Sequence, residues 1–439
     1  MRRSTLEPVL IVETLLLAAS APFWLFPTRF PYATLGMLLI SALWWAARWV
    51  IDGRTFSTSS FNGALLLWGV AVGVGTTVTA FPDLTLSKTA GLLLGLAAWR
   101  YLVIVVEDER RLRWAVAGFV AVGVSVAFIG VLSARWGAKV PGLQSLIEHL
   151  PPQVVSLPEA PERGVSANQL AGALVIYLPL VLSGFLGYIL PERGSVTVDV
   201  QRENRWLRTV GIVGTFVGLA GLLILTQSRS GWVGGVAGVL VLALLWAFSG
   251  ETRWPKWASL IIIVTLGVIT TILLWRVGPD QIVALWDQHG GVDTEIVGQI
   301  SLSGRVEIWS RALYAIQDFP FTGCGLGTFR EVIWILYPLF TIESGSDIAH
   351  AHNMFLQVAV DTGLPGLIAY LALLGIAGTV GWRIAKRDRR LRPLALGLVA
   401  GLIALHVYGL TEALAPGSKP GLIFWLALGL LAVMERLSK

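Results

Sequence analysis

The chain of 439 residues combines 55% hydrophobic residues with only 14% charged residues, and its mean hydropathy is +0.72. This composition has too few polar side chains to cover a water-soluble globule, so it predicts an integral membrane protein and argues against a cytosolic enzyme, a nucleic-acid binder and a single-pass receptor. A net charge of +6 would otherwise suggest nucleic acid, but we expect most basic residues in cytoplasmic loops, facing anionic membrane lipids. The single cysteine, Cys324, excludes an internal disulfide and a cysteine-rich metal site.

Apolar runs predict an all-α polytopic fold with about 12 transmembrane helices. The predicted spans cover residues 9–26, 32–50, 62–81, 87–106, 114–134, 167–190, 209–227, 231–249, 258–275, 356–382, 394–412 and 420–435. We divide the chain into spans 1–9 (residues 1–275, with an outer loop at about 135–166), a large extracytoplasmic loop with amphipathic helices (276–355), and spans 10–12 (356–439).

The distribution of basic residues predicts that both termini are cytoplasmic. In that orientation the inside segments hold 21 of the 33 Lys and Arg residues, the outside segments hold 11, and Arg100 lies within a span. This bias agrees with the positive-inside rule. The segment 276–355 is the only part long enough to form a small structured layer outside the membrane, so we expect an extracytoplasmic function to lie there.

The second half of this outer segment shows a helical pattern. Val306, Trp309, Leu313 and Ile316 recur at spacings of three and four, which predicts an amphipathic helix at about 303–318. The glycines at 323, 325 and 327 could suggest a nucleotide fingerprint, but no strand precedes them, so we interpret them as a turn. A second, aromatic-rich helix is expected from about 328 to 339, lying at the membrane interface.

Arg229 follows an apolar run so closely that it must lie at or just below the outer membrane boundary. An arginine at that depth needs a partner, because its insertion costs up to roughly 3 kcal/mol at the helix centre. Snorkelling to lipid phosphates is one explanation. The small residues around it, which let a bulky ligand approach the backbone, favour an anionic ligand instead.

Two further polar sites lie near the same outer face. Arg305 opens the amphipathic helix, with Ser303 as its expected cap, and a guanidinium at a helix N-terminus suits phosphate. Taken alone, Arg305 fits a solvated helix charge better than a phosphate ligand. Arg163, with Asn168 beside the sixth span, is a weaker candidate for anion binding.

His350, Ala351, His352 and Asn353 form the densest polar cluster before an apolar run. A histidine here could take a proton from an attacking hydroxyl. The alternatives are a helix-capping or interfacial histidine, and a zinc site, although no third ligand has metal-like spacing. The position of the cluster at the end of the outer segment favours the base.

Together these residues provide several arginines, one candidate base and no Asp-x-Asp motif anywhere in the chain. A glycan on a lipid diphosphate already carries a good leaving group, whose charge arginines can stabilise without a metal. The inventory therefore predicts glycosyl transfer from a lipid diphosphate at the outer membrane face, without a cofactor.

The stretches carrying these residues resemble the O-antigen ligase and O-antigen polymerase superfamily. The similarity covers about 226–382: Ser228 to Trp232, Ser303 to Trp309, Phe319 to Phe329, and His350 to Gln357 followed by Asp361 to Gly363. The Arg163 to Asn168 stretch is supporting, and the N-terminal spans match only in number and hydropathy.

The resemblance implies a GT-C-like glycosyltransferase of the bacterial cytoplasmic (inner) membrane that moves a glycan from undecaprenyl diphosphate to a glycan or lipid acceptor. By similarity, His352 is the catalytic base, Arg229 and Arg305 hold the donor diphosphate, and Arg163, His350, Asn353 and Asn168 are supporting candidates. It leaves open whether the enzyme is a ligase or a polymerase.

Two readings from other classes stay open. A twelve-helix transporter could use Glu13, His406 and Glu412 as intramembrane coupling sites, although Glu412 lies near the end of its span and could instead face the active cavity. Against a transporter, the polar cluster is external and no internal repeat is detectable. A scaffold in an envelope complex is the third possibility.

Overall fold

The computed structural model describes residues 3–52, 58–134, 143–150, 165–189, 205–249, 302–343 and 346–438, with a few isolated residues between these ranges. Every named element within them is helical, and one isolated bridge joins Ala134 to Val165. The predicted all-α class is confirmed for this part of the chain.

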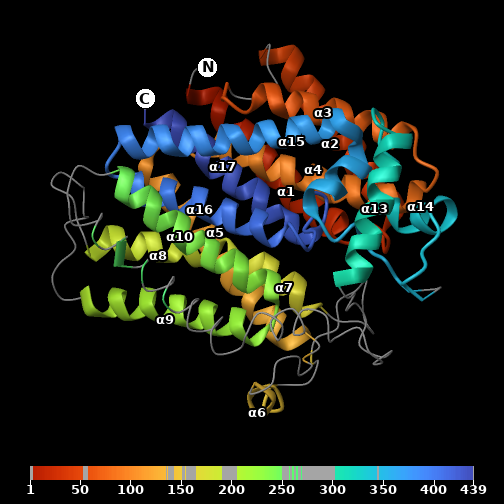
Figure 1. The fold of residues 1–439 in the computed structure, drawn as a ribbon. Coiled ribbons are helices and arrows are strands. Elements are labelled where there is room, and N and C mark those ends of the chain that lie inside the picture. The colour runs from red at the N-terminus through yellow and green to blue at the C-terminus, as the bar shows by residue number, and fades with distance from the viewer. Residues whose placement is uncertain are drawn as a thin grey trace.

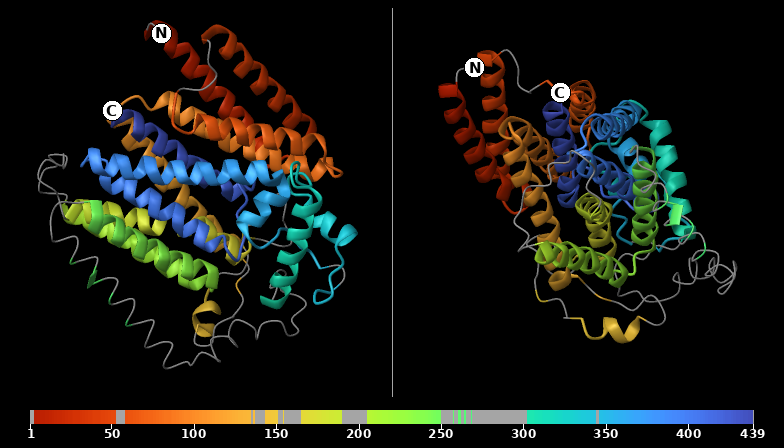
Figure 2. Two further views of the ribbon diagram at one scale, coloured as in Figure 1. Left: turned by 45° about the horizontal axis from the view of Figure 1, so that its top comes forward. Right: turned by 90° about the vertical axis from the view of Figure 1, so that its left-hand side faces the viewer.

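The long helices lie side by side in one bundle, and α13 and α14 cross one end of it (Figure 1). The chain ends labelled N and C lie away from α13 and α14 (Figure 2). The helices are α1 (Arg3–Leu25), α2 (Pro31–Asp52), α3 (Asn62–Thr77), α4 (Pro82–Val105), α5 (Glu109–Ser133), α6 (Gln144–Ile147), α7 (Ala167–Val175), α8 (Tyr177–Ile189), α9 (Arg205–Leu225), α10 (Arg229–Ser249), α13 (Leu302–Asp318), α14 (Phe329–Leu336), α15 (Met354–Arg387), α16 (Arg392–Tyr408), the 3-10 turn η2 (Lys419–Gly421) and α17 (Leu422–Leu437).

Among the described residues, seven helices are long and apolar enough to cross a membrane, and four shorter apolar helices accompany them. These eleven segments coincide with eleven of the predicted spans. The remaining one, 258–275, falls almost wholly outside the described residues, so the count of twelve stays a prediction, as do the domain bounds and the placement of the outer loop.

The predicted end of the eleventh span at residue 412 is wrong, because α16 ends at Tyr408. Gly409 ends the helix by turning its carbonyl to the backbone N–H of Met354 at 2.6 Å, which ties α16 to the start of α15. Glu412 consequently lies in the loop after α16 rather than within a span.

Glycines bring α10 and α16 into close backbone contact. A Cβ at Gly234 would lie 2.6 Å from the Ala404 carbonyl oxygen, and one at Gly238 would lie 2.7 Å from the Ala404 Cβ. Small residues permit such close packing of membrane helices, where lipid is as apolar as the helix surface. The two helices therefore form a tight pair, with Arg229 at the start of α10 and Glu412 in the loop after α16.

A kink divides α15 at Gly363, whose φ is +70°. A Cβ there would lie 2.6 Å from the Phe321 carbonyl carbon, and the neighbouring Leu364 N–H donates to the Pro320 carbonyl at 2.7 Å. The predicted glycine turn is confirmed, since Gly323, Gly325 and Gly327 all have positive φ. This turn packs into the kink and so joins the outer layer to the bundle.

An ion pair between Glu13 of α1 and Arg100 of α4 is buried inside the bundle. The other carboxylate oxygen of Glu13 accepts from the Trp44 indole N–H at 2.7 Å, and the Arg100 guanidinium lies 5.6 Å from the centre of the Trp45 ring. Because both charges are desolvated, each depends on the other.

Candidate functional site

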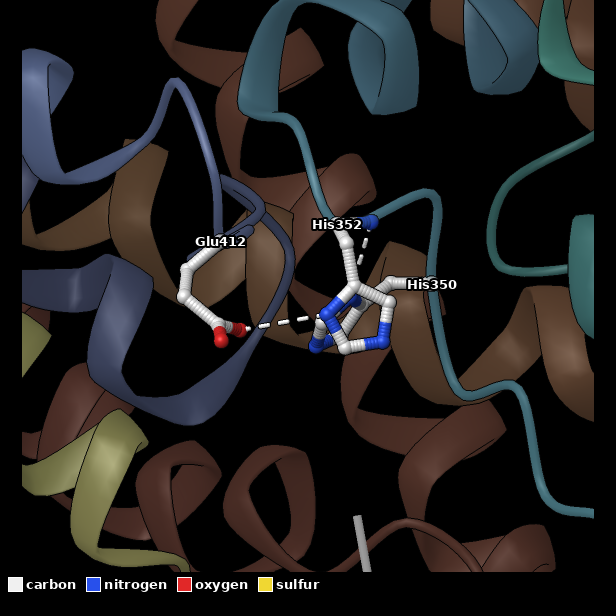
Figure 3. A group of neighbouring side chains, drawn as sticks. All are labelled: His350, His352 and Glu412. Atoms are coloured by element: carbon white, nitrogen blue, oxygen red, sulfur yellow. Dashed lines mark hydrogen bonds and ion pairs between the residues drawn. The ribbon is translucent and has the colours of Figure 1, made fainter. Parts of the chain in front are cut away.

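Polar side chains from distant parts of the chain meet where several helices end, beneath α13. The contributing segments are the first turn of α7, the loop before α15, the loop after α16 and the first turn of α13. Figure 3 shows how Glu412, from the loop after α16, points toward the two histidines from the loop before α15.

Glu412 lies at the centre of this cluster and is only 4% exposed. Its Oε1 accepts from Arg305 Nη2 at 2.6 Å and from Asn168 Nδ2 at 3.1 Å. Its Oε2 lies 3.4 Å from His352 Nδ1, which is an ion-pair distance rather than a well-formed hydrogen bond. One carboxylate thus faces a guanidinium, an amide and an imidazole.

Burial by itself would raise the pKa of Glu412, but its contact with His352 and the charge of Arg305 outweigh it and hold the pKa at about 2. The carboxylate is therefore ionised at neutral pH. It supplies the negative charge that the surrounding cationic groups share.

His352 is held in an unusual backbone conformation. Among the described residues, Gln227 and His352 are the two non-glycine residues with positive φ, at 50° and 47°. The His352 carbonyl accepts from the Trp309 indole N–H of α13 at 3.3 Å, and its N–H donates to His350 Nδ1 at 3.2 Å. Such strained residues concentrate at functional sites, and here one precedes Arg229 by two positions while the other is the predicted base.

His350 stacks beside His352, with the ring centres 4.3 Å apart. Burial, followed by the neighbouring His352, lowers the pKa of His350 to about 3. The His350 ring is therefore neutral at ordinary pH, and its Nδ1 serves as a hydrogen-bond acceptor for the backbone of His352.

Positive charge gathers around the cluster. Arg229, at the start of α10, lies near enough to Arg305 for the two charges to repel each other. Lys88 of α4 adds positive charge near His350. Arg305 Nε is buried and has no hydrogen-bond acceptor in the described part of the chain. Glu412 pairs with Arg305, and Asp361 interacts with Lys88, while the buried Nε of Arg305 offers a donor to an additional anion.

Asn353 has a structural place, as the N-cap of α15. Its Oδ1 accepts from the N–H groups of Phe355 and Leu356 at 2.9 and 3.1 Å, and its Nδ2 donates to the Leu410 carbonyl at 3.0 Å. The cap thereby fastens the loop that carries His352 to the loop that carries Glu412.

A buried network behind the histidines was not among the predicted site residues. Gln357 accepts from the Ala351 N–H at 2.7 Å and donates to Asp361 at 2.9 Å, and Asp361 accepts from the Gly327 N–H at 2.9 Å. Their spacing of four on one helix face is the sequence signal that could have identified the pair. The network ties the histidine loop to the glycine turn.

The outer layer braces the site through α13. Glu307 accepts from the N–H groups of Phe340 and Thr341 at 2.6 and 2.9 Å, and Arg311 donates to the Pro338 carbonyl at 2.8 Å. Ser303 was expected to cap this helix; that prediction is wrong, because α13 begins one residue earlier, at Leu302. Arg305 therefore lies in the first turn, with its side chain directed at Glu412 rather than at open solvent.

The structure brings Asn168, Arg305, His350, His352 and Asn353 into one neighbourhood, with Arg229 close to Arg305. Arg163 lies outside the described residues. Glu412 was not among the predicted site residues, although its place near the end of a predicted span left open that it faces the active cavity; the structure places it in the cluster.

The sequence spacing predicted no third metal ligand beside the two histidines, but in the structure Glu412 lies close enough to be one. His350, His352 and Glu412 each offer a ligand atom within 4.8 Å of the others. However, Glu412 Oε1 is already engaged by Arg305 at 2.6 Å, and the nearby Arg229 and Lys88 charges oppose a divalent cation. The local charges favour an anion over a metal ion.

Comparison with known proteins gives one family match and two relatives. A family described as O-antigen ligase matches residues 214–371. The O-antigen ligase of Pseudomonas aeruginosa is 28% identical over 188 residues, which is 42% of this chain and 39% of that protein. The exopolysaccharide production protein ExoQ of Rhizobium meliloti is 23% identical over 323 residues, 67% of this chain and 72% of that protein.

The matched segment holds Arg229, Arg305 and both histidines, whereas Asn168 and Glu412 lie on either side of it. The alignment with the first relative spans about two fifths of that protein's length.

Proposed function

From the premise that this chain carries a domain of the O-antigen ligase superfamily, we propose that it transfers a glycan from undecaprenyl diphosphate to an acceptor hydroxyl at the outer face of the bacterial inner membrane. The observation that supports the proposal best is the cluster around Glu412, whose carboxylate contacts both Arg305 and His352, two residues from distant segments.

His352 is the proposed base. With Glu412 Oε2 at 3.4 Å from Nδ1, the carboxylate favours the tautomer that carries the proton on Nδ1 and leaves Nε2 as an acceptor. Catalytic hydrogen bonds are often long without substrate and tighten when it binds. Nε2 removes the acceptor's hydroxyl proton as that oxygen bonds to the anomeric carbon.

The anomeric carbon then loses its bond to the diphosphate, which leaves on the lipid carrier. Arg229 and Arg305 stabilise the charge that develops on this leaving group. Arg305 has an unpartnered Nε for that purpose, and the mutual repulsion of the two guanidinium groups is relieved by an added anion. Because arginine carries this charge, the proposed reaction uses no metal ion.

The acceptor separates a ligase from a polymerase. We favour a ligase-like reaction on a lipid acceptor, in keeping with the family match. A polymerase acting on a second lipid-linked repeat unit is the second candidate, because the relative named for exopolysaccharide production matches over much more of both chains.

The transporter alternative receives less support from the geometry. Glu13 is paired with Arg100, His406 is hydrogen-bonded to Tyr370 and to the Leu402 carbonyl, and Glu412 lies beyond the end of α16. The polar cluster around Glu412 lies at helix ends rather than near the helix midpoints, where transporters usually bind their substrates.

The test supplies purified protein with a fluorescent glycan on undecaprenyl diphosphate and two acceptors, a lipid A core and a second lipid-linked repeat unit. We expect glycosylated core from a ligase and elongated lipid-linked chains from a polymerase. His352→Gln should abolish both products while the protein stays monodisperse in detergent. His149→Gln is the matched control, since His149 lies on the segment at α6, apart from the bundle (Figure 1). Normal transfer by folded His352→Gln protein would refute the base assignment.

A further inference from the structure

A groove of about 290 Å³ lies between α15 and α16, and its lining residues Phe355 and Leu410 are close in sequence to His352 and Glu412. Its lining includes Phe355, Leu374, Gly378, Ile403, His406 and Leu410. This volume falls near the lower limit for ligand pockets in proteins. Leu410, which lines the groove two residues before Glu412, is 48% exposed.

The wall of the groove is apolar even where it contains a histidine. His406 Nδ1 lies 2.6 Å from the Leu402 carbonyl, and its Nε2 lies 2.7 Å from the Tyr370 hydroxyl. Both ring nitrogens are thus satisfied inside the protein, and no other lining side chain is polar. A polar ligand would gain no hydrogen bond from these side chains, which selects for a hydrocarbon.

The groove is continuous with the candidate active site. Phe355 follows His352 by three residues, and Leu410 precedes Glu412 by two. The hydrogen bond from Asn353 to the Leu410 carbonyl joins these two loops at the mouth. The groove follows α16 away from the site from Val407 to Val399, which is about 12 Å at a helical rise of 1.5 Å per residue.

We infer that this groove holds the first isoprene units of the donor's lipid carrier. A chain attached directly to a diphosphate at Arg305 would leave the charged cluster as pure hydrocarbon, which is what the groove accepts. A phospholipid would instead place glycerol ester groups against the apolar wall. The inference rests on the proposed function in taking a lipid diphosphate as the ligand of the arginines.

Direct labelling tests the inference without any glycosyl transfer. Purified protein is irradiated with a prenyl diphosphate that carries a diazirine near the diphosphate end and no sugar, and the adducts are mapped by mass spectrometry. Adducts on α15 and α16 at the groove, displaced by unlabelled undecaprenyl diphosphate but not by phosphatidylglycerol, are expected. The inference would be overturned by adducts found only elsewhere, or by labelling that phosphatidylglycerol and undecaprenyl diphosphate displace equally well.

Two glycines of α15 provide matched variants. A Cβ at Gly378, inside the groove, or at Gly375, outside it, would meet no atom within 4 Å, so α15 accepts a side chain at either position. Gly378→Phe should fill the groove and reduce labelling by about tenfold or more, whereas Gly375→Phe should label like the wild type. Equal labelling of the two variants would contradict the inference.

The groove and the function can fail separately. If the wild-type protein is labelled in the groove but transfers no glycan to either acceptor, the proposed function fails and the lipid groove stands. If it transfers glycan while Gly378→Phe leaves both labelling and the KM for the donor unchanged, the groove assignment fails and the function stands.

Discussion

Replacing Glu412 by glutamine tests the central contact of the site. The glutamine carbonyl can still accept from Arg305 and Asn168, which lie 2.6 and 3.1 Å from the present carboxylate oxygen. Its amide N–H₂ then faces His352 Nδ1, where the carboxylate oxygen now lies at 3.4 Å. An N–H donor at that point favours the tautomer with the proton on Nε2, which removes the base from the acceptor's side.

General base catalysis typically contributes about 10²- to 10⁴-fold to a rate, so kcat should fall by roughly that factor in Glu412→Gln. The KM for the donor should change far less, because the arginines keep an acceptor. The assay is the initial rate of glycan transfer in proteoliposomes as a function of donor concentration and pH. We also expect the acid limb of the pH–rate profile to change, which a purely structural role would not produce.

Asn168→Ala is the matched comparison, since it removes a second hydrogen bond to Glu412 without altering the carboxylate. A net hydrogen bond is worth about 1 kcal/mol, so this variant should lose at most about tenfold in kcat. If folded Glu412→Gln protein keeps the wild-type kcat and pH profile, Glu412 does not set the His352 tautomer.

Four further predictions concern stability, pH and metal ions. Arg100→Leu should destabilise the protein by about 3–5 kcal/mol, because Glu13 is left buried without its partner. In thermal denaturation the Glu13→Gln/Arg100→Leu double variant should recover most of this loss. Equal melting temperatures of the single and double variants would contradict the pairing. Gly363→Ala should cost at least about 1–3 kcal/mol, because its φ is +70° and a Cβ would strike Phe321, whereas Gly375→Ala should melt like the wild type. Burial lowers the pKa of His350 to about 3, so between about pH 6.5 and 3 the unfolded chain binds a proton that the folded protein does not. The free energy of unfolding therefore falls as the pH drops through that window, by up to about 1.4 kcal/mol per pH unit. The melting temperature of His350→Gln should fall less steeply than that of the wild type between pH 6.5 and 5. Chelation of divalent ions should leave the transfer rate unchanged, and restoration of a lost rate by one added metal would show that the histidines and Glu412 bind it.

The sequence was most informative where one physical requirement dominates. Helices in a membrane need long apolar runs, so the predicted spans and described helices agree closely. The amphipathic helix and the glycine turn were equally accessible, because the 3.6-residue repeat and the glycine cluster each predict one local structure.

The contacts of Glu412 were not accessible in that way. They join residues 168, 305, 352 and 412, and no local pattern records such distances in sequence. Beyond the end of α16 the chain makes hydrogen bonds such as that from the Met354 N–H to the Gly409 carbonyl, which hydropathy does not detect. The structure thus supplied the partner of the predicted base, while the histidine itself was visible from its polar context.

The ion pair between Arg305 and Glu412 has a consequence for selectivity among anions. Arg305 already holds an anion that belongs to the protein, so any incoming phosphate must compete with an internal carboxylate fixed at 2.6 Å. A singly charged lipid headgroup, which is abundant in the bilayer, gains little from that exchange. If the ligand is the proposed lipid diphosphate, it brings more charge than such a headgroup, so we expect the ion pair to favour the donor over the surrounding membrane lipid.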